Sequence, residues 1–108
     1  MLYKFKSPAA ADLIMLEPHG RRVLQIIGKP VDVKQGILQP VDMPVAAAAL
    51  EAAIVHEEAQ RKAAEAEAAA RGEELPPQES ISLRQRAAPF IEMLRRCEKA
   101  DKAIVWGV

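Results

Sequence analysis

The sequence is poor in the residue types from which many functional sites are built. Its 108 residues include one cysteine, two histidines, one tryptophan, one tyrosine and two phenylalanines. A single cysteine, Cys97, excludes an internal disulfide and predicts a reducing compartment. Aromatic side chains make up 4% of the chain, too few to predict a surface that stacks sugars or nucleobases.

Long apolar runs are also missing, since none approaches the roughly 18 residues of a membrane span. The first sixteen residues carry two lysines and a short apolar stretch, as a secretory signal does. Asp12 interrupts that stretch, however, and Glu17 and Pro18 follow it in place of a small-residue cleavage site. We therefore expect a cytoplasmic protein without a membrane partner.

Metal-binding and catalytic constellations are not apparent either. A zinc site needs three or four ligands in compact spacing, but His19, His56 and Cys97 lie in three separate segments. Cys97 shares a helical face with Phe90 and Leu94, which predicts a structural thiol rather than a nucleophile. The five glycines are isolated, so no phosphate-binding loop is expected. We predict no catalytic residue, no metal and no cofactor.

The charges balance overall but are unevenly distributed. Residues 1–38 and 80–108 each carry a net charge of +3, whereas residues 39–79 carry −6. An acidic middle between basic ends predicts that these segments lie against one another or against a second copy. A nucleic-acid partner is not expected, because it would require a basic excess.

The N-terminal third predicts a β-hairpin and a helix. Residues 2–6 alternate between apolar and lysine, which is typical of a half-buried strand, and the apolar run 13–16 predicts a second strand. Residues 7–12 are interpreted as the connection, residues 17–20 as a turn, residues 21–28 as a helix and residues 29–39 as a loop.

Two further helices are predicted from position 42 onward. Asp42 is a candidate N-cap, and Met43, Ala47, Leu50 and Ile54 follow at buried-helix spacing. The final helix begins after Ser82, which forms a capping-box pattern with Gln85. Pro89 lies inside this helix and predicts a kink or break near residue 88.

The C-terminal residues "AIVWGV" predict a strand, because Ile104, Trp106 and Val108 point to one side of an extended chain. The expected fold is α+β: a three-stranded antiparallel sheet, formed by the N-terminal hairpin and the C-terminal strand, with helices on one face. Residues 1–108 then form a single domain, in which residues 56–79 are an Ala/Glu-rich helical arm and loop. An exposed C-terminal hook is the alternative for the tail.

The helical part of the arm, residues 56–71, has no apolar side chain larger than alanine. Three i,i+4 pairs support it: Glu57–Arg61, Glu58–Lys62 and Glu67–Arg71. One interpretation is a solvated arm. The other is self-association, because Ala59, Ala63, Ala66 and Ala70 follow a 4-3-4 spacing that lets two helices approach closely as an antiparallel pair.

Arginines of the final helix are candidates for binding an anion or an acidic partner, because guanidinium groups bind carboxylates and phosphates bidentately. The set comprises Arg84, Arg86, Arg95 and Arg96, with His19 as a possible companion. The competing interpretation is ion pairing with the acidic middle helix.

Four stretches resemble a known family: "IMLEPHGRRVLQIIGK" (14–29), "MPVAAAALEAAI" (43–54), "SLRQRAAPFIEMLRR" (82–96) and "VWGV" (105–108), together with the "YKFKS" opening. With them the chain resembles a small uncharacterised bacterial family, the domain of unknown function numbered eighteen-forty. The resemblance covers most of the chain except the arm and its loop. It implies a cytoplasmic bacterial protein and no established activity.

The leading functional hypothesis is a non-enzymatic interaction or assembly module that self-associates, as a homodimer for example, or docks on a protein partner. The alternative is a small-ligand (anion) binding protein or enzyme that uses Arg84, Arg86 and His19 in a pocket between the sheet and the Pro89 kink. An RNA-associated role is a weaker third hypothesis.

Overall fold

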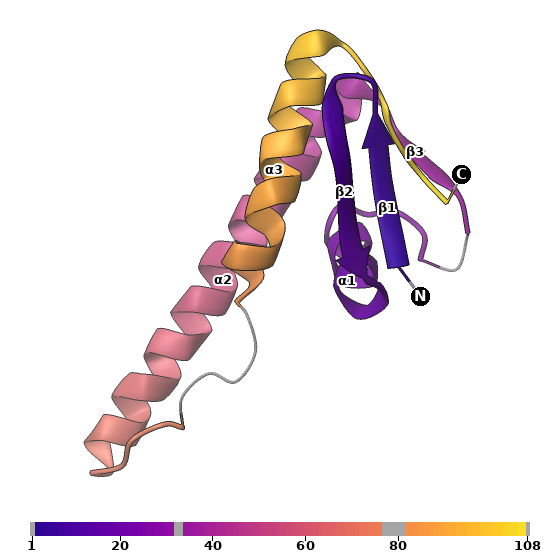
Figure 1. The fold of residues 1–108 in the computed structure, drawn as a ribbon. Coiled ribbons are helices and arrows are strands. Elements are labelled where there is room, and N and C mark those ends of the chain that lie inside the picture. Colours follow the sequence, from indigo (N-terminus) through magenta and orange to yellow (C-terminus); the bar gives the residue numbers. More distant parts are fainter. Residues whose placement is uncertain (1, 32–33, 77–81, 108) are drawn as a thin grey trace.

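The computed structural model describes residues 2–31, 34–76 and 82–107, and they form an α+β fold (Figure 1). Four strands make one antiparallel sheet, and three α-helices accompany it. In chain order the elements are β1 (Leu2–Ser7), β2 (Ala10–Leu16), α1 (Glu17–Ile26), β3 (Gly36–Leu38), the short 3₁₀ helix η1 (Pro40–Asp42), α2 (Met43–Ala70), α3 (Leu83–Ala100) and β4 (Ile104–Trp106).

The two ends of the chain meet in the sheet, whose strand order is β2-β1-β4-β3. Strand β4 pairs antiparallel with β1, placing Trp106 opposite Phe5, and with β3 on its other side. The predicted pairing of the C-terminal strand with the N-terminal hairpin is confirmed. The predicted number of three strands is wrong, because β3 lies within residues 29–39, which the sequence indicated as loop.

The first helix begins earlier than predicted. Helix α1 starts at Glu17, so residues 17–20 are helical and do not form a turn. Pro18 is compatible with this start because a proline in the first helical turn sacrifices no intrahelical hydrogen bond. Strand β2 likewise begins at Ala10, so the hairpin connection is shorter than the predicted 7–12.

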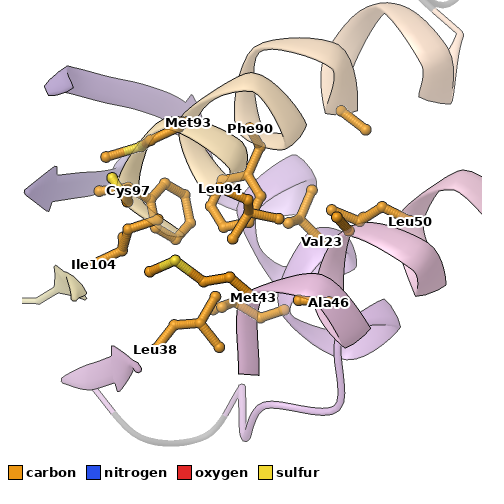
Figure 2. Packing of buried hydrophobic residues seen from close by; sticks show 14 of the residues in the cluster. Val23, Leu38, Met43, Ala46, Leu50, Phe90, Met93, Leu94, Cys97 and Ile104 are labelled. Atoms are coloured by element: carbon orange, nitrogen blue, oxygen red, sulfur yellow. The ribbon is translucent and has the colours of Figure 1, made fainter. Parts of the chain in front are cut away.

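The hydrophobic core lies between one face of the sheet and the helices (Figure 2). Phe5, Leu38 and Ile104 from the sheet meet side chains of all three α-helices. Each α-helix contributes buried residues: Val23 and Leu24 from α1, Met43, Ala46, Ala47, Leu50 and Ile54 from α2, and Leu83, Ala87, Phe90, Met93, Leu94 and Cys97 from α3.

The long helix α2 gives the molecule its extended shape. Its 28 residues span about 42 Å, and its C-terminal half projects beyond α1 and the sheet (Figure 1). The radius of gyration is 16.0 Å, whereas a compact chain of this length has about 13 Å. The predicted arm is therefore present as helix as far as Ala70, and residues 77–79 of its loop lie outside the described residues.

Local predictions for the ends of the helices are partly confirmed. Ser82 and Gln85 form the predicted capping box at the start of α3. Asp42 makes no side-chain cap hydrogen bond, because η1 already leads the backbone into α2. Helix α3 runs without a break through Pro89, so of the predicted kink or break near residue 88 the break is wrong. The kink stays a prediction.

Candidate functional site

Two of the candidate arginines lie against acidic residues of α2. Arg84 donates two hydrogen bonds of 2.8 Å to the Glu58 carboxylate, from Nε to Oε2 and from Nη2 to Oε1. This bidentate contact lowers the pKa of Glu58 and raises the pKa of Arg84. Arg95 donates to Glu51, two helical turns of α2 further along the α2–α3 contact. The structure thus brings the two basic side chains onto carboxylates of the same chain.

The other two arginines lie elsewhere on α3. Arg96 forms an i,i+4 ion pair with Glu92 at 3.6 Å. Arg86 lies close enough to His19 of α1 for its charge to act on the imidazole. The pKa of His19 is lowered, first by desolvation and then by this positive charge. The positive charge of Arg86 therefore reaches His19, while Arg84 is engaged with Glu58.

An open cavity of about 380 Å³ lies beside Arg84, between α2 and the start of α3. Its lining includes the carboxylates of Glu57, Glu58 and Glu65 in addition to basic groups, and it does not include His19 or Arg86. An anion that entered this cavity would face three carboxylates. The cavity therefore does not combine the residues that the ligand-binding hypothesis requires.

The remaining candidates for metal or thiol chemistry, Cys97 and His56, differ in their exposure to solvent. Cys97 is fully buried in the core, whereas His56 is exposed on α2. Within residues 2–31, 34–76 and 82–107, no group of three or more His, Cys, Asp or Glu side chains is arranged to hold a metal ion. Cys97 contributes to packing there.

The ion pairs of the arm differ from the predicted pattern at two of three places. Glu67 pairs with Arg71 as predicted, at 3.2 Å. Glu57 pairs with Arg22 of α1, and Arg61 pairs with Glu65 and donates to the carbonyl of Pro76 in the following loop. The predicted Glu57–Arg61 and Glu58–Lys62 pairs are wrong, because tertiary partners on α1 and α3 take the two glutamates.

The four alanines that predict self-association lie on one exposed line of α2, which continues toward the N-terminus of the helix. We call this line the outer stripe, and all its residues are exposed and uncharged: Val45, Ala48, Ala52, Val55, Ala59, Ala63, Ala66 and Ala70. Successive members are three or four positions apart, so the stripe runs parallel to the helix axis. It faces away from Met43, Leu50 and Ile54, which are buried in the core.

Half of the outer stripe was not identified from the sequence. Sequence reasoning singled out Ala59, Ala63, Ala66 and Ala70 but not the continuation through Val45 and Val55. The signal was present, since the same 3-4 spacing continues upstream. It was obscured because the buried residues of α2 follow the same period on the opposite side of the helix.

The outer face of the sheet is a second exposed apolar surface. Leu2 and Leu16 are paired across β1 and β2, and both are 58% exposed. Ile14 and Ile37 are exposed on the same face of the sheet. In the described parts of the chain, no helix has the length and apolar character needed to cross a membrane.

Comparison with known proteins gives one match. The model of a family described as a domain of unknown function, DUF1840, matches residues 1–106. The matched range includes the arm and its loop, so the narrower extent of the resemblance drawn from the sequence is corrected. The match carries no information on a bacterial source. No curated protein and no solved structure matches the chain.

Proposed function

Because the chain belongs to DUF1840, a family of unknown function, we propose its function from its surfaces: a non-enzymatic interaction or assembly module. The module self-associates or docks on a protein partner through apolar surfaces that its own fold leaves uncovered. The outer stripe of α2 is the observation that carries this proposal.

The outer stripe has the character of a contact surface. Val45 is 74% exposed and Val55 is 60% exposed, and the stripe has no charged member over eight positions. Contiguous exposed apolar patches mark interaction sites more often than scattered apolar residues do. A helix that served only as a solvated arm would carry polar or charged residues on this side.

The engagement of the arginines supports the same proposal. Arg84 and Arg95 meet Glu58 and Glu51 within the chain, so binding a small anion there would require breaking existing ion pairs. These pairs are about half exposed and contribute little to stability. They lie along the α2–α3 contact and leave the outer stripe uncovered on another side of α2.

One feature favours the alternative of anion binding, namely that the charge of Arg86 acts on His19 and lowers its pKa. A titration of the protein with inorganic phosphate, followed by the NMR signals of His19, tests this alternative. We expect no saturable shift. A saturable shift that disappears in Arg86→Gln would favour a ligand-binding function over the assembly module.

The proposed function is tested by a pull-down in which single charges are placed on and beside the outer stripe. Val55→Glu puts a carboxylate in the stripe, and Gln60→Glu adds the same charge at an exposed position on a different side of α2. We expect Val55→Glu to lose binding partners, including other copies of the chain, that the wild type and Gln60→Glu retain.

Equal capture by all three proteins would contradict an assembly function of the outer stripe. Light scattering on the same samples separates self-association from binding of another protein. Retention of nucleic acid that is lost as salt is raised would instead support the RNA-associated role.

A further inference from the structure

We infer that the outer stripe binds a second copy of itself, so that two α2 helices pack antiparallel about a two-fold axis near residues 57 and 58. This inference rests on the proposed function and names the partner as the same chain. Three features of the chain carry it: the distribution of side-chain size along the stripe, the distribution of charge along the sequence, and the position of Lys62.

Side-chain size along the outer stripe matches an antiparallel copy. Its two valines lie in the N-terminal part, and its last four members are alanines. When two copies of the stripe lie face to face and run in opposite directions, four kinds of contact result: Val45 with Ala70, Ala48 with Ala66, Ala52 with Ala63, and Val55 with Ala59. Each valine then meets an alanine, as interdigitated helix packing requires.

A parallel pair of stripes would place each valine against its own copy and leave the remaining contacts as alanine against alanine. The valine–valine contacts would then be overpacked and the alanine–alanine contacts would leave gaps, and both are unfavourable. The stripe is therefore complementary to itself in only one of the two orientations. An isologous interface of this kind closes with two subunits and does not propagate.

Charge favours the same orientation. Residues 56–79, the arm and its loop, carry three basic and seven acidic groups, a net charge of −4. The rest of the chain, residues 1–55 and 80–108, which we call the body, carries twelve basic and eight acidic groups, a net charge of +4. In the antiparallel pair each acidic arm lies beside the other copy's basic body, whereas a parallel pair would place the two acidic arms together.

One charged residue at the margin of the outer stripe has a place in this arrangement. Lys62 is exposed and adjoins Ala63 of the stripe. Glu51 lies on the same margin, toward the other end of α2. In the antiparallel register, Lys62 of each copy lies within one helical turn of Glu51 in the other, where it joins the Glu51–Arg95 ion pair as a second cation.

The expected affinity is modest. A standard interface uses about 20–30 residues per partner, and the outer stripe provides eight, most of them alanine. We therefore expect a dimer with a micromolar dissociation constant. Sedimentation equilibrium of the intact protein, from about 5 to about 500 µM, covers this range.

The first test compares Ala63→Glu with Gln60→Glu in that experiment. Ala63→Glu places a carboxylate against Ala52 of the other copy and is expected to weaken the dimer about tenfold or more. Gln60→Glu adds the same charge outside the stripe and is expected to leave the dissociation constant unchanged. Both positions are exposed, so circular dichroism should show unchanged helix content in both variants.

The second test determines the orientation by disulfide formation. Ala52→Cys and Ala63→Cys are prepared as separate proteins, and Cys97 remains in place because it is buried. Mild oxidation of an equimolar mixture is expected to give the mixed dimer in preference to either homodimer. Preferential formation of the two homodimers would overturn the antiparallel arrangement.

A monomeric mass over the whole concentration range would overturn the inference. The proposed function would still stand in that case if Val55→Glu lost a partner protein that Gln60→Glu retained. If neither self-association nor such a partner were found, both the inference and the proposed function would be contradicted.

Discussion

At the scale of single residues, the packing of Trp106 determines which residues its neighbouring strands can carry beside it. The indole is buried, with its ring centroid 5.7 Å from that of Phe5. Its other neighbour across the sheet is Gly36, the first residue of β3. In the sequence Gly36 was typical of a loop. Its lack of a side chain matters because Trp106 packs against it, and Trp106 lies 70 positions further along the chain. Burial of Trp106 could be predicted, but the neighbour that makes room for it could not.

We predict that Gly36→Ala destabilises the protein. A Cβ atom at this position would lie 2.2 Å from Cζ2 of Trp106, and the indole is packed in the core and cannot move away freely. Overpacking of this kind costs about 1–3 kcal/mol. Urea unfolding followed by Trp106 fluorescence measures the loss. Gln35→Ala, at an exposed neighbouring position, is the control, and an equal midpoint for both variants would contradict the prediction.

A second prediction at this scale concerns pH. Desolvation and the charge of Arg86 lower the pKa of His19 in the folded protein, so the unfolded chain takes up a proton on His19 at a higher pH than the folded chain does. The free energy of unfolding therefore decreases as the pH falls through the ordinary histidine value of about 6.5. His19→Gln should lose less stability than the wild type over this range.

Urea unfolding at about pH 7.5 and about pH 5.5 brackets the ordinary histidine value and measures the difference. His56→Gln, at an exposed position of α2, is the matched control. The same pH dependence in His19→Gln and in the wild type would show that His19 is not its source.

At the scale of secondary-structure elements, those with strong local signals could be predicted. Helix α3 has a capping box at Ser82 and a regular apolar face, and it was predicted from its first residue. Strand β3 has three residues, too few for a periodic pattern, and it exists because it pairs with β4. The start of α1 was missed because "EPHG" satisfies both turn chemistry and a helix with proline in its first turn.

Helix α3 contains a local conflict that yields a third prediction. Pro89 is exposed and lies seven positions into the helix, where it provides no N–H for the carbonyl of Gln85. Pro89→Ala restores this hydrogen bond and should stabilise the protein by about 1–3 kcal/mol. Thermal unfolding followed by circular dichroism measures the change.

The control for Pro89→Ala is Glu92→Ala, one turn further along the exposed side of α3. We expect it to change stability by no more than about 0.5 kcal/mol. A lower stability of Pro89→Ala would mean that the proline ring makes a contact that outweighs the missing hydrogen bond.

At the scale of the whole molecule, the body and the arm have different roles. The body is closed by the pairing of the first and last strands, and all the residues of the continuous core lie within it. Ala68 of the arm is buried but is not part of that core cluster. The alanines of the outer stripe that lie in the arm could be identified from the sequence, but whether they are exposed depends on which side of α2 the body covers. Tertiary packing decides this point.

This division yields the last prediction: the body should fold without the arm. Glu58 and Arg84 are hydrogen bonded, so Ala59 and Ser82 lie close together and a linker of about four Gly/Ser residues can replace residues 60–81. Because α2 keeps its core residues from Met43 to Ile54, we expect cooperative unfolding with little loss of stability. The radius of gyration from X-ray scattering should fall from 16.0 Å to about 12 Å. A molten or unfolded product would mean that the arm stabilises the body as well as presenting a surface. In the dimer inferred above, the same deletion removes Ala63, Ala66 and Ala70, three of the eight members of the outer stripe, so the shortened protein should remain monomeric at concentrations where the intact chain pairs.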